Sequence, residues 1–171
     1  MVAIRSARPG DLSPLWDLVR RAVAHMNALG NPQWGSDYPT LALYTADQAA
    51  GELYVAVNGA GRVLGCACIN GAESPEYAAV AWSASPAYSV HRLAVDPEVQ
   101  RQGVATALMA YAEELARRAG VPALHVDTYA RNDRMQALFQ KRGFRRVGAI
   151  SLHGRPEPYP RFEKLIFPDK V

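Results

Sequence analysis

The chain has 171 residues, of which 49% are hydrophobic and 20% are charged. This length suits one domain with a sizeable core, and the composition is ordinary for a globular protein. No apolar run approaches the ~18 residues of a membrane span, and no signal peptide is evident, so we expect a cytoplasmic protein with no membrane partner.

The net charge of +3 is unevenly spread along the chain. The segment 100–146 holds nine Lys or Arg residues against four Asp or Glu residues, and the remainder is slightly acidic. This local excess suits a small polyanionic ligand better than a nucleic acid, which usually meets longer basic stripes. A merely solvated basic helix face is the alternative explanation.

The N-terminal half of the chain predicts helices on either side of a loop, followed by a hairpin. Apolar residues at three- and four-residue steps indicate a helix that Asp11 can cap and that ends near Gly30. The segment 30–40 is rich in Gly, Pro and Asn, which predicts a loop. Around these we expect a strand at Ala3–Arg5, a helix at about Thr40–Ala50, and a hairpin of strands at Glu52–Val57 and Arg62–Asn70.

The C-terminal half alternates between strand and helix patterns. Such alternation requires at least one parallel crossover beside the antiparallel N-terminal strands. In chain order we expect an irregular segment or a weak strand at 73–86, strands at Ser89–Val95 and Ala123–Thr128, a helix between them from near Gly103 to Gly120, a helix at Asn132–Arg142, and closing strands at Phe144–Ser151 and Arg161–Phe167. The sequence therefore predicts one mixed α/β domain over residues 1–171.

The two cysteines, Cys66 and Cys68, lie two positions apart on a predicted strand and so point to the same face. No matching cluster of His or Cys residues accompanies them, so we expect no metal site. Buried reduced thiols are the expected state, with a reactive thiol as the weaker alternative.

The entry to the helix near Gly103 lacks the usual capping residues. Helices commonly begin at Ser, Thr, Asp or Asn, often with an acid in the first turn, whereas the first acid here is Glu113. A helix N-terminus carries about half a positive charge and several N–H groups without partners, so an anion can replace the missing cap. Gly103 lets a ligand approach the backbone and Arg101 adds a cation, which together favour a phosphate or pyrophosphate site.

The six residues from Gln100 to Ala105 match the pattern [QR]-x-x-G-x-[GA], which resembles the acetyl-CoA pyrophosphate loop of the GNAT superfamily of N-acetyltransferases. The segment from Asn132 to Phe144 resembles the second signature of this superfamily, N-x-x-A-x-x-L-Y-x-x-x-G-F, with Asn, Leu, Gly and Phe in register. The stretches ELYV, VHRLAVDP, DTYARN and RFEKL are similar to one branch of small bacterial members. The resemblance covers most of the chain.

The resemblance implies a GNAT-like fold: a mixed twisted sheet of about six or seven strands, flanked by about four helices. The two central parallel strands are expected to splay where acetyl-CoA inserts. The resemblance further implies an acetyltransferase that moves an acetyl group from acetyl-CoA to a primary amine of a small molecule or peptide. The amine would attack the thioester directly in a ternary complex. A homodimer is left open.

The residues that the resemblance assigns to acetyl-CoA fall into three groups. The backbone of Leu93, Ala94 and Val95 would pair with the pantetheine arm, and Asn132 would reach that arm with its side chain. The loop N–H groups would hold the pyrophosphate, so that Gln100, Arg101, Gln102, Gly103, Val104, Ala105 and Thr106 line it. Met135, Phe139 and Arg142 complete the expected contacts, with Lys141 and Arg131 as alternatives to Arg142 for the ribose phosphate.

Two departures from the superfamily pattern bear on catalysis. Met135 replaces a small Ala, which is expected to change packing only. Phe139 replaces the Tyr that many members use to protonate the departing thiolate, so no acid can be assigned at that position. Tyr129 is a candidate for the missing hydroxyl, with a surface role as its alternative.

His91 is the candidate base, because it lies on the strand that leads into the loop and its ordinary pKa suits proton transfer near neutrality. A structural histidine is the alternative, and the acids Glu73 and Glu76 are further candidates. Trp34 and Tyr38, in the loop at 30–40, are expected to line the acceptor site or else to cover the core. Two rival functions are a non-catalytic acyl-CoA sensor or regulatory module and, more weakly, nucleic-acid binding.

Overall fold

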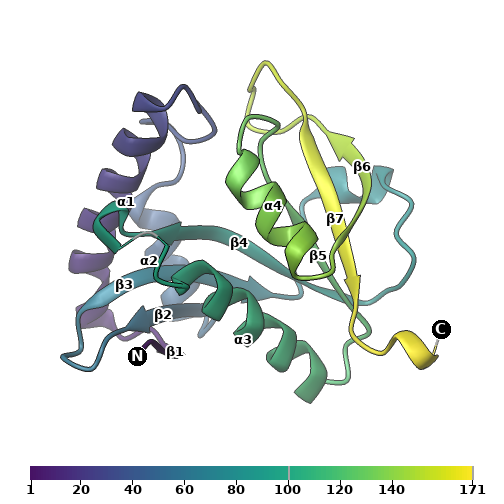
Figure 1. Cartoon of the computed structure of the whole chain (residues 1–171), viewed down its shortest axis with the longest axis horizontal. Coiled ribbons are helices and arrows are strands. Elements are labelled where there is room, and N and C mark those ends of the chain that lie inside the picture. The colour runs from purple at the N-terminus through teal and green to yellow at the C-terminus, as the bar shows by residue number, and fades with distance from the viewer. Residues whose placement is uncertain (100, 171) are drawn as a thin grey trace. The chain divides into compact units, whose positions relative to one another are not determined.

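The computed structural model describes residues 1–99 and 101–170 and contains one mixed sheet with four α-helices (Figure 1). The strand order is β1-β2-β3-β4-β5-β7-β6. The strands are β1 (Ala3–Ser6), β2 (Leu53–Val57), β3 (Val63–Asn70), β4 (Ala87–Val95), β5 (Ala123–Asp127), β6 (Arg145–Ile150) and β7 (Tyr159–Leu165). The helices are α1 (Leu12–Ala28), α2 (Leu41–Ala49), α3 (Val104–Arg118) and α4 (Asp133–Lys141). The predicted fold class, a mixed α/β sheet with a parallel central pair, is confirmed.

The chain divides into two compact units. The first comprises Met1–Ile69 and Val90–Tyr111, and the second comprises Asn70–Ser89 and Ala112–Val171. Strand β4 and helix α3 each contribute residues to both units, because the boundaries fall inside these elements. The expectation of a single domain over the whole chain stays a prediction.

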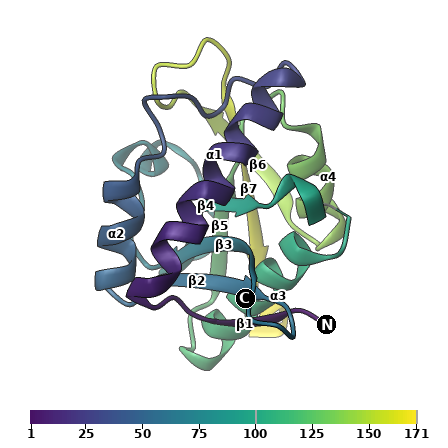
Figure 2. The same ribbon diagram turned by 90° about the vertical axis from the view of Figure 1, so that its left-hand side faces the viewer.

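In the first unit, α1 and α2 pack on one face of the antiparallel strands β1, β2 and β3 (Figure 2). Alternate residues of a strand point to opposite faces, so Leu53, Val55 and Val57 all reach the core beneath these helices. Tyr54, between Leu53 and Val55, packs against Tyr111 of α3 with the rings tilted and their centroids 5.2 Å apart. The part of α3 that belongs to the first unit therefore covers the opposite face of the same strands.

The N-terminus of α1 differs from the expectation in one detail. Asp11 occupies the cap position, but its carboxylate accepts hydrogen bonds from Arg5 and from the Arg8 N–H rather than from the helix. The expected side-chain cap at Asp11 is therefore wrong, because an ion pair with a neighbouring strand takes its oxygens.

In the second unit, the first three residues of β4 pair in parallel with the first three of β5, from Ala87 with Ala123 to Ser89 with His125. Antiparallel pairing then continues from β5 to β7 and from β7 to β6. Helix α4 packs its Phe139 against Phe144 and Phe162, with ring centroids 5.6 and 5.2 Å apart. The irregular segment expected at 73–86 contains one short 3₁₀ helix, at Pro75–Ala79.

Both cysteines are free and buried in β3, as expected. Burial raises the pKa of the Cys66 thiol to about 12, which leaves it protonated and unreactive near neutrality. None of the helices that the structure describes has both the length and the apolar character of a membrane span.

Gly65 of β3 is required by the close approach of α3 and β4 in the first unit. A Cβ atom at this position would lie 2.8 Å from the Ala94 carbonyl oxygen and 2.8 Å from Cγ1 of Val104. Because the Ala94 carbonyl oxygen belongs to the backbone, it cannot move away without displacing β4. A larger residue at Gly65 therefore overpacks the contact between β3, β4 and the start of α3.

We predict that Gly65→Ala lowers the free energy of unfolding by about 1–3 kcal/mol, because the added methyl group forces β4 or α3 to move. Urea unfolding measures this change. The matched control is Gly59→Ala, since a Cβ there meets nothing within 4 Å and its φ is not left-handed. Equal stability of the two variants would contradict the proposed role of Gly65.

Candidate functional site

Strand β4 carries a left-handed residue, Arg92, whose φ is 51°. Non-glycine residues rarely adopt this conformation, and within a strand it acts as a bulge that redirects the backbone. The guanidinium donates to both carboxylate oxygens of Asp47, at 2.9 and 2.7 Å, while the Arg92 carbonyl oxygen accepts from the Tyr44 hydroxyl at 3.1 Å. Hydrogen bonds thus hold both the side chain and the carbonyl oxygen of Arg92, and they stabilise the bend in the strand.

The turn after β4 is held by the buried carboxylate of Asp96. One oxygen accepts from the Glu98 N–H at 3.0 Å, and the other accepts from the guanidinium groups of Arg21 and Arg62 at 2.9 and 2.8 Å. The Asp96 N–H donates to the Leu64 carbonyl oxygen, which ties the turn to β3. These bonds fix where the following loop starts.

The loop that enters α3 has two left-handed residues in close succession. Arg101 has a φ of 68° and Gly103 has a φ of 77°. Alternation of left- and right-handed backbone turns successive N–H groups toward one point, which forms a concave anion-binding nest. A Cβ at Gly103 would meet nothing within 4 Å, so the space in front of the nest is open to a ligand. Gln100 lies outside the described residues.

The other predicted cofactor residues of the first unit surround this loop. Leu93, Ala94 and Val95 form the end of β4, directly after the bend at Arg92. In the first turn of α3, Val104 is buried, Ala105 is half-buried and Thr106 is exposed, and no acidic side chain is present. An open nest followed by an acid-free first turn fits the pyrophosphate of a nucleotide cofactor.

The predicted cofactor residues of the second unit lie on α4 and at its ends. Asn132 is the N-cap of α4, and its side-chain oxygen accepts from the Met135 N–H at 3.2 Å. Phe139 is buried in the aromatic cluster of this unit. Arg142 donates to the buried carboxylate of Glu113 at 2.6 Å. Each of these residues has a structural role, and its contact with a cofactor stays a prediction.

The candidate acceptor residues, Trp34 and Tyr38, differ in their surroundings. Trp34 is buried in the core of the first unit, which favours the covering role that was its alternative. Tyr38 is only partly buried, and its hydroxyl accepts from Arg92 at 3.4 Å. Of these two candidates, Tyr38 is therefore the one that borders the bend in β4.

The candidate base, His91, is half-buried in β4 and immediately precedes the bend. Tyr129, the candidate for the missing hydroxyl, is fully buried, and its oxygen accepts from the Glu157 N–H at 3.1 Å. That bond favours a structural role for Tyr129.

Sequence reasoning missed the bend at Arg92 and its partner Asp47. The signal in the sequence is an arginine within a strand pattern, and it does not identify an ion pair with a carboxylate 45 positions away. The contacts of His125 in β5 with Glu73 and Glu163, over 52 and 38 positions, were missed for the same reason.

The sequence model of the acetyltransferase (GNAT) family matches residues 21–144 of this chain. The chain belongs to the GNAT acetyltransferase family. Because this is a family of acetyltransferases, membership supports an acyltransferase. The open nest before α3 lies within the matched residues. No curated protein matches the chain.

Solved structures of GNAT proteins share the fold over almost the whole chain. A GNAT-family acetyltransferase from Streptococcus agalactiae has a TM-score of 0.84 and 23% identity, covering 96% of this chain and 95% of that one. A putative acetyltransferase from Staphylococcus aureus has a TM-score of 0.73 and 26% identity, covering 95% and 98%. The ribosomal-protein-S18-alanine N-acetyltransferase of Escherichia coli has a TM-score of 0.68 and 20% identity, covering 97% and 94%.

We predict that Asp96→Asn lowers the free energy of unfolding by roughly 1–3 kcal/mol at neutral pH, because two guanidinium groups lose their charged acceptor. Burial raises the pKa of Asp96, but hydrogen bonds from the Glu98 N–H, Arg21 and Arg62 outweigh it and leave the pKa below its ordinary value. The contribution is therefore present above the unfolded-state pKa and is lost as the pH falls through the folded-state pKa.

Urea unfolding at neutral pH and at pH about 3, below the ordinary carboxyl pKa, measures this dependence. The difference between wild type and Asp96→Asn should shrink at the lower pH. Glu98→Gln is the control, because Glu98 shares Arg62 but its side chain is 65% exposed. A pH-independent difference would show that the charge of Asp96 does not hold the turn.

Proposed function

We propose that this GNAT protein is an acetyl-CoA-dependent N-acetyltransferase that moves the acetyl group to a primary amine of a small molecule or peptide. The observation that carries the proposal is the pair of left-handed residues, Arg101 and Gly103, in front of the acid-free first turn of α3. This arrangement offers N–H groups to an anion at the place where the family holds its cofactor.

In this proposal the cofactor is bound by backbone more than by side chains. N–H groups from Arg101 to Thr106 hold the pyrophosphate, and the lack of a side chain at Gly103 leaves the space in front of them open. The backbone of Leu93 to Val95, at the end of β4 after Arg92, pairs with the pantetheine arm. On the family resemblance alone, the proposal also includes Asn132, Met135, Phe139 and Arg142 among the residues that contact acetyl-CoA.

The chemistry requires a neutral amine and a leaving thiolate. Most aliphatic amines are protonated near neutrality, so the nucleophile must lose a proton before it attacks the thioester carbonyl. His91 is the proposed base at the reacting atoms, because it lies next to the bend that begins the pantetheine strand. A thiol has a pKa near 8.5, so the thiolate leaves without a strong acid, and Phe139 is compatible with turnover.

The acceptor is proposed to approach along the loop at 30–40, past Tyr38. A phenol ring beside a partly buried guanidinium offers an apolar surface and a hydroxyl, which suits an amine on a short carbon chain or a peptide N-terminus. The S18-alanine acetyltransferase among the structural relatives acts on a protein alanine, so peptide N-termini belong among the amines to be assayed.

A non-catalytic acyl-CoA sensor is the second candidate, and the observation that favours it is Phe139 in place of a hydroxyl-bearing residue. A sensor would bind acetyl-CoA without turnover. Release of free CoA thiol across a panel of polyamines, amino acids, aminoglycosides and peptide N-termini separates the two functions.

We predict that Gly103→Glu weakens acetyl-CoA binding at least about tenfold, because the new carboxylate occupies the nest and repels the pyrophosphate. Isothermal calorimetry measures the affinity. Gly120→Glu is the matched control, since Gly120 has a φ of 69°, has nothing within 4 Å of its Cβ position and ends the same helix. Absence of binding by the wild-type protein would remove the proposed function altogether.

We predict that His91→Ala lowers kcat by roughly tenfold to a thousandfold with little change in acetyl-CoA affinity, the usual effect of losing one acid–base group. Steady-state CoA release and calorimetry provide the two readouts. His153→Ala, at an exposed histidine of the second unit, is the control. Full activity of His91→Ala would assign His91 a structural role.

A further inference from the structure

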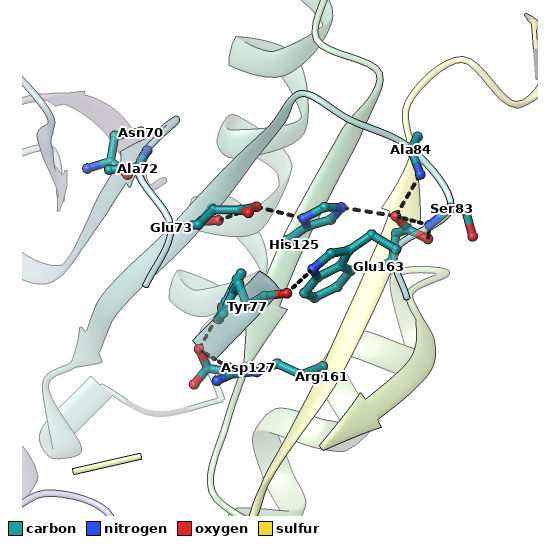
Figure 3. A network of polar contacts seen from close by, with 12 residues as sticks. Asn70, Ala72, Glu73, Tyr77, Ser83, Ala84, His125, Asp127, Arg161 and Glu163 are labelled. Carbon is teal, nitrogen blue, oxygen red and sulfur yellow. Dashed lines mark hydrogen bonds and ion pairs between the residues drawn. The ribbon is translucent and has the colours of Figure 1, made fainter. Parts of the chain in front are cut away.

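The segment 73–84, which we call the strap, is attached to the strands of the second unit only through contacts that involve side chains (Figure 3). Its backbone–backbone hydrogen bonds run within it, from the Tyr77 N–H to the Ser74 carbonyl oxygen and from the Val80 N–H to the Tyr77 carbonyl oxygen. Among the described residues, no such bond joins the strap to β5, β6 or β7. Side-chain contacts therefore decide whether the strap lies on these strands.

The central contact of the strap is with a buried histidine of β5. His125 is 1% exposed, and its Nδ1 lies 2.6 Å from Oε1 of Glu73 in the strap while its Nε2 lies 3.0 Å from Oε2 of Glu163 in β7. The indole ring of Trp82, also in the strap, stacks on the imidazole with a centroid distance of 3.7 Å. Both nitrogens and one face of the ring are thus in use.

Glu163 settles which nitrogen of His125 donates to it. The Glu163 carboxylate accepts from the backbone N–H groups of Ser83 and Ala84, at 3.0 and 3.2 Å. Burial raises the pKa of Glu163, but these bonds and the one from His125 outweigh it, so its pKa lies below the ordinary value. An ionised carboxylate only accepts hydrogen bonds, so Nε2 of His125 is the donor.

The contact between His125 and Glu73 then requires a second proton. A neutral imidazole that donates from Nε2 has a lone pair on Nδ1, which repels a carboxylate oxygen. The short contact therefore contains a proton, and this proton belongs to Nδ1 because imidazole is a stronger base than a carboxylate. The face of the stacked Trp82 indole also favours a cationic ring. The strap is thus held by a doubly protonated histidine.

The other contacts of the strap involve groups that do not titrate near neutral pH. The Tyr77 hydroxyl donates to Asp127 of β5 at 2.7 Å, and burial raises the pKa of Tyr77 well above its ordinary value. Arg145 of β6 donates to the Ser83 hydroxyl at 3.0 Å. The contact of Glu73 with His125 is therefore the one among these whose proton depends on pH near neutrality.

A buried arginine beneath the strap opposes its closure. Arg161 of β7 has a side chain that is 0% exposed, forms an ion pair with Asp127 and lies under the Tyr77 ring, whose centroid is 4.2 Å from its Cζ. Nε and Nη2 of Arg161 have no hydrogen-bond acceptor among the described residues. Buried donors without acceptors are costly, so exposure of this guanidinium to solvent favours an open strap.

We propose that the strap is a pH-dependent cover, which the proton between Glu73 and His125 holds on β5 and β7 and which opens when that proton is lost. Opening removes the Tyr77 ring from Arg161 and exposes the ion pair of Arg161 with Asp127 to solvent. All of these residues belong to the second unit, and the device is independent of acetyl transfer.

The direction of the pH dependence follows from the proton balance. In the open strap Glu73 is a solvated carboxylate, and a solvated imidazole is neutral above about pH 6.5. Closing therefore takes up one proton above this pH, so the equilibrium constant for opening rises by up to about tenfold per pH unit. The other titratable or charged groups that face the contact are Glu163, Tyr77, Asp127 and Arg161. Carboxylates and guanidinium groups titrate far from this range.

Hydrogen exchange of the Ser83 and Ala84 amides reports the opening, because both N–H groups bond to the Glu163 side chain in the closed strap. Solvent-exchange NMR from about pH 6 to 9, divided by the intrinsic rate of an unprotected amide at each pH, gives their protection factors. We predict that protection of these two amides falls at least about tenfold over this range. Amides of β5 that pair with β7 should keep their protection.

We predict that Glu73→Gln removes this pH dependence while it keeps the contact. The side-chain amide of the variant donates to the lone pair on Nδ1 of a neutral His125, so closing takes up no proton. Protection of Ser83 and Ala84 should then stay constant within about threefold over the same pH range.

Glu76→Gln is the matched control, because Glu76 is an exposed acid of the strap, and it should keep the wild-type pH dependence. Constant protection in the wild type, or the same fall in Glu73→Gln as in the wild type, would overturn the proposal. Loss of protection in β5 would show that the variant unfolds, and the wild-type measurement then decides.

The protonation of His125 gives a second readout that uses the wild-type protein. In ¹⁵N spectra of labelled histidine, both ring nitrogens of His125 should carry a proton at about pH 6. Nδ1 should lose its proton over the same range in which Ser83 and Ala84 lose protection. His125→Gln assigns the signals. A neutral ring at pH about 6 in the protected state would overturn the proton count.

Discussion

The bidentate ion pair between Arg92 and Asp47 is the constraint on which the first unit's site depends. A left-handed arginine inside a strand costs of order 1–3 kcal/mol and persists only where its surroundings determine it. Here Asp47 of α2 holds the guanidinium and the Tyr44 hydroxyl holds the carbonyl oxygen. The strand leaves this point bent, and the buried Asp96 then fixes the turn that leads to the nest before α3. Bend, turn and nest follow one another along the chain, and in our proposal their backbone, rather than their side chains, binds the cofactor.

The second unit buries several charged and polar side chains, which carries a desolvation cost. A histidine between two carboxylates and an arginine with 0% side-chain exposure are costly unless paired, and replacement by apolar groups would often be as stable. The backbone N–H groups of Ser83 and Ala84 and the stacked Trp82 fix these groups in place. The segment 71–86, which has little regular structure, is thereby attached to β5 and β7 by polar contacts. Buried polar groups of this kind contribute little to the free energy of unfolding, but they fix the orientation of the side chains that they connect.

Much of the fold could be predicted from the sequence, because its strands and helices have regular apolar spacing and are ended by glycines such as Gly120 and Gly143. The nest could be predicted as well, because the lack of a capping residue next to Gly103 leaves backbone N–H groups at the helix N-terminus without partners. The side-chain function of Asp11 could not, because Arg5 competes for its carboxylate. The bend at Arg92 and the partners of His125 could not either, because contacts over 45 and 52 positions leave no periodic signal. Long-range contacts of this kind are the hardest to predict, because neither partner carries a local sign of the other.

The central claim is that backbone N–H groups before α3 bind the pyrophosphate of CoA. Amide hydrogen exchange of the wild-type protein, followed residue by residue with and without CoA, tests it most directly. The account predicts slower exchange for amides of the segment 101–106 in the presence of CoA, with exchange in the β2–β3 turn at 58–61 unchanged. Binding of CoA that leaves the exchange of 101–106 unaltered would contradict the account.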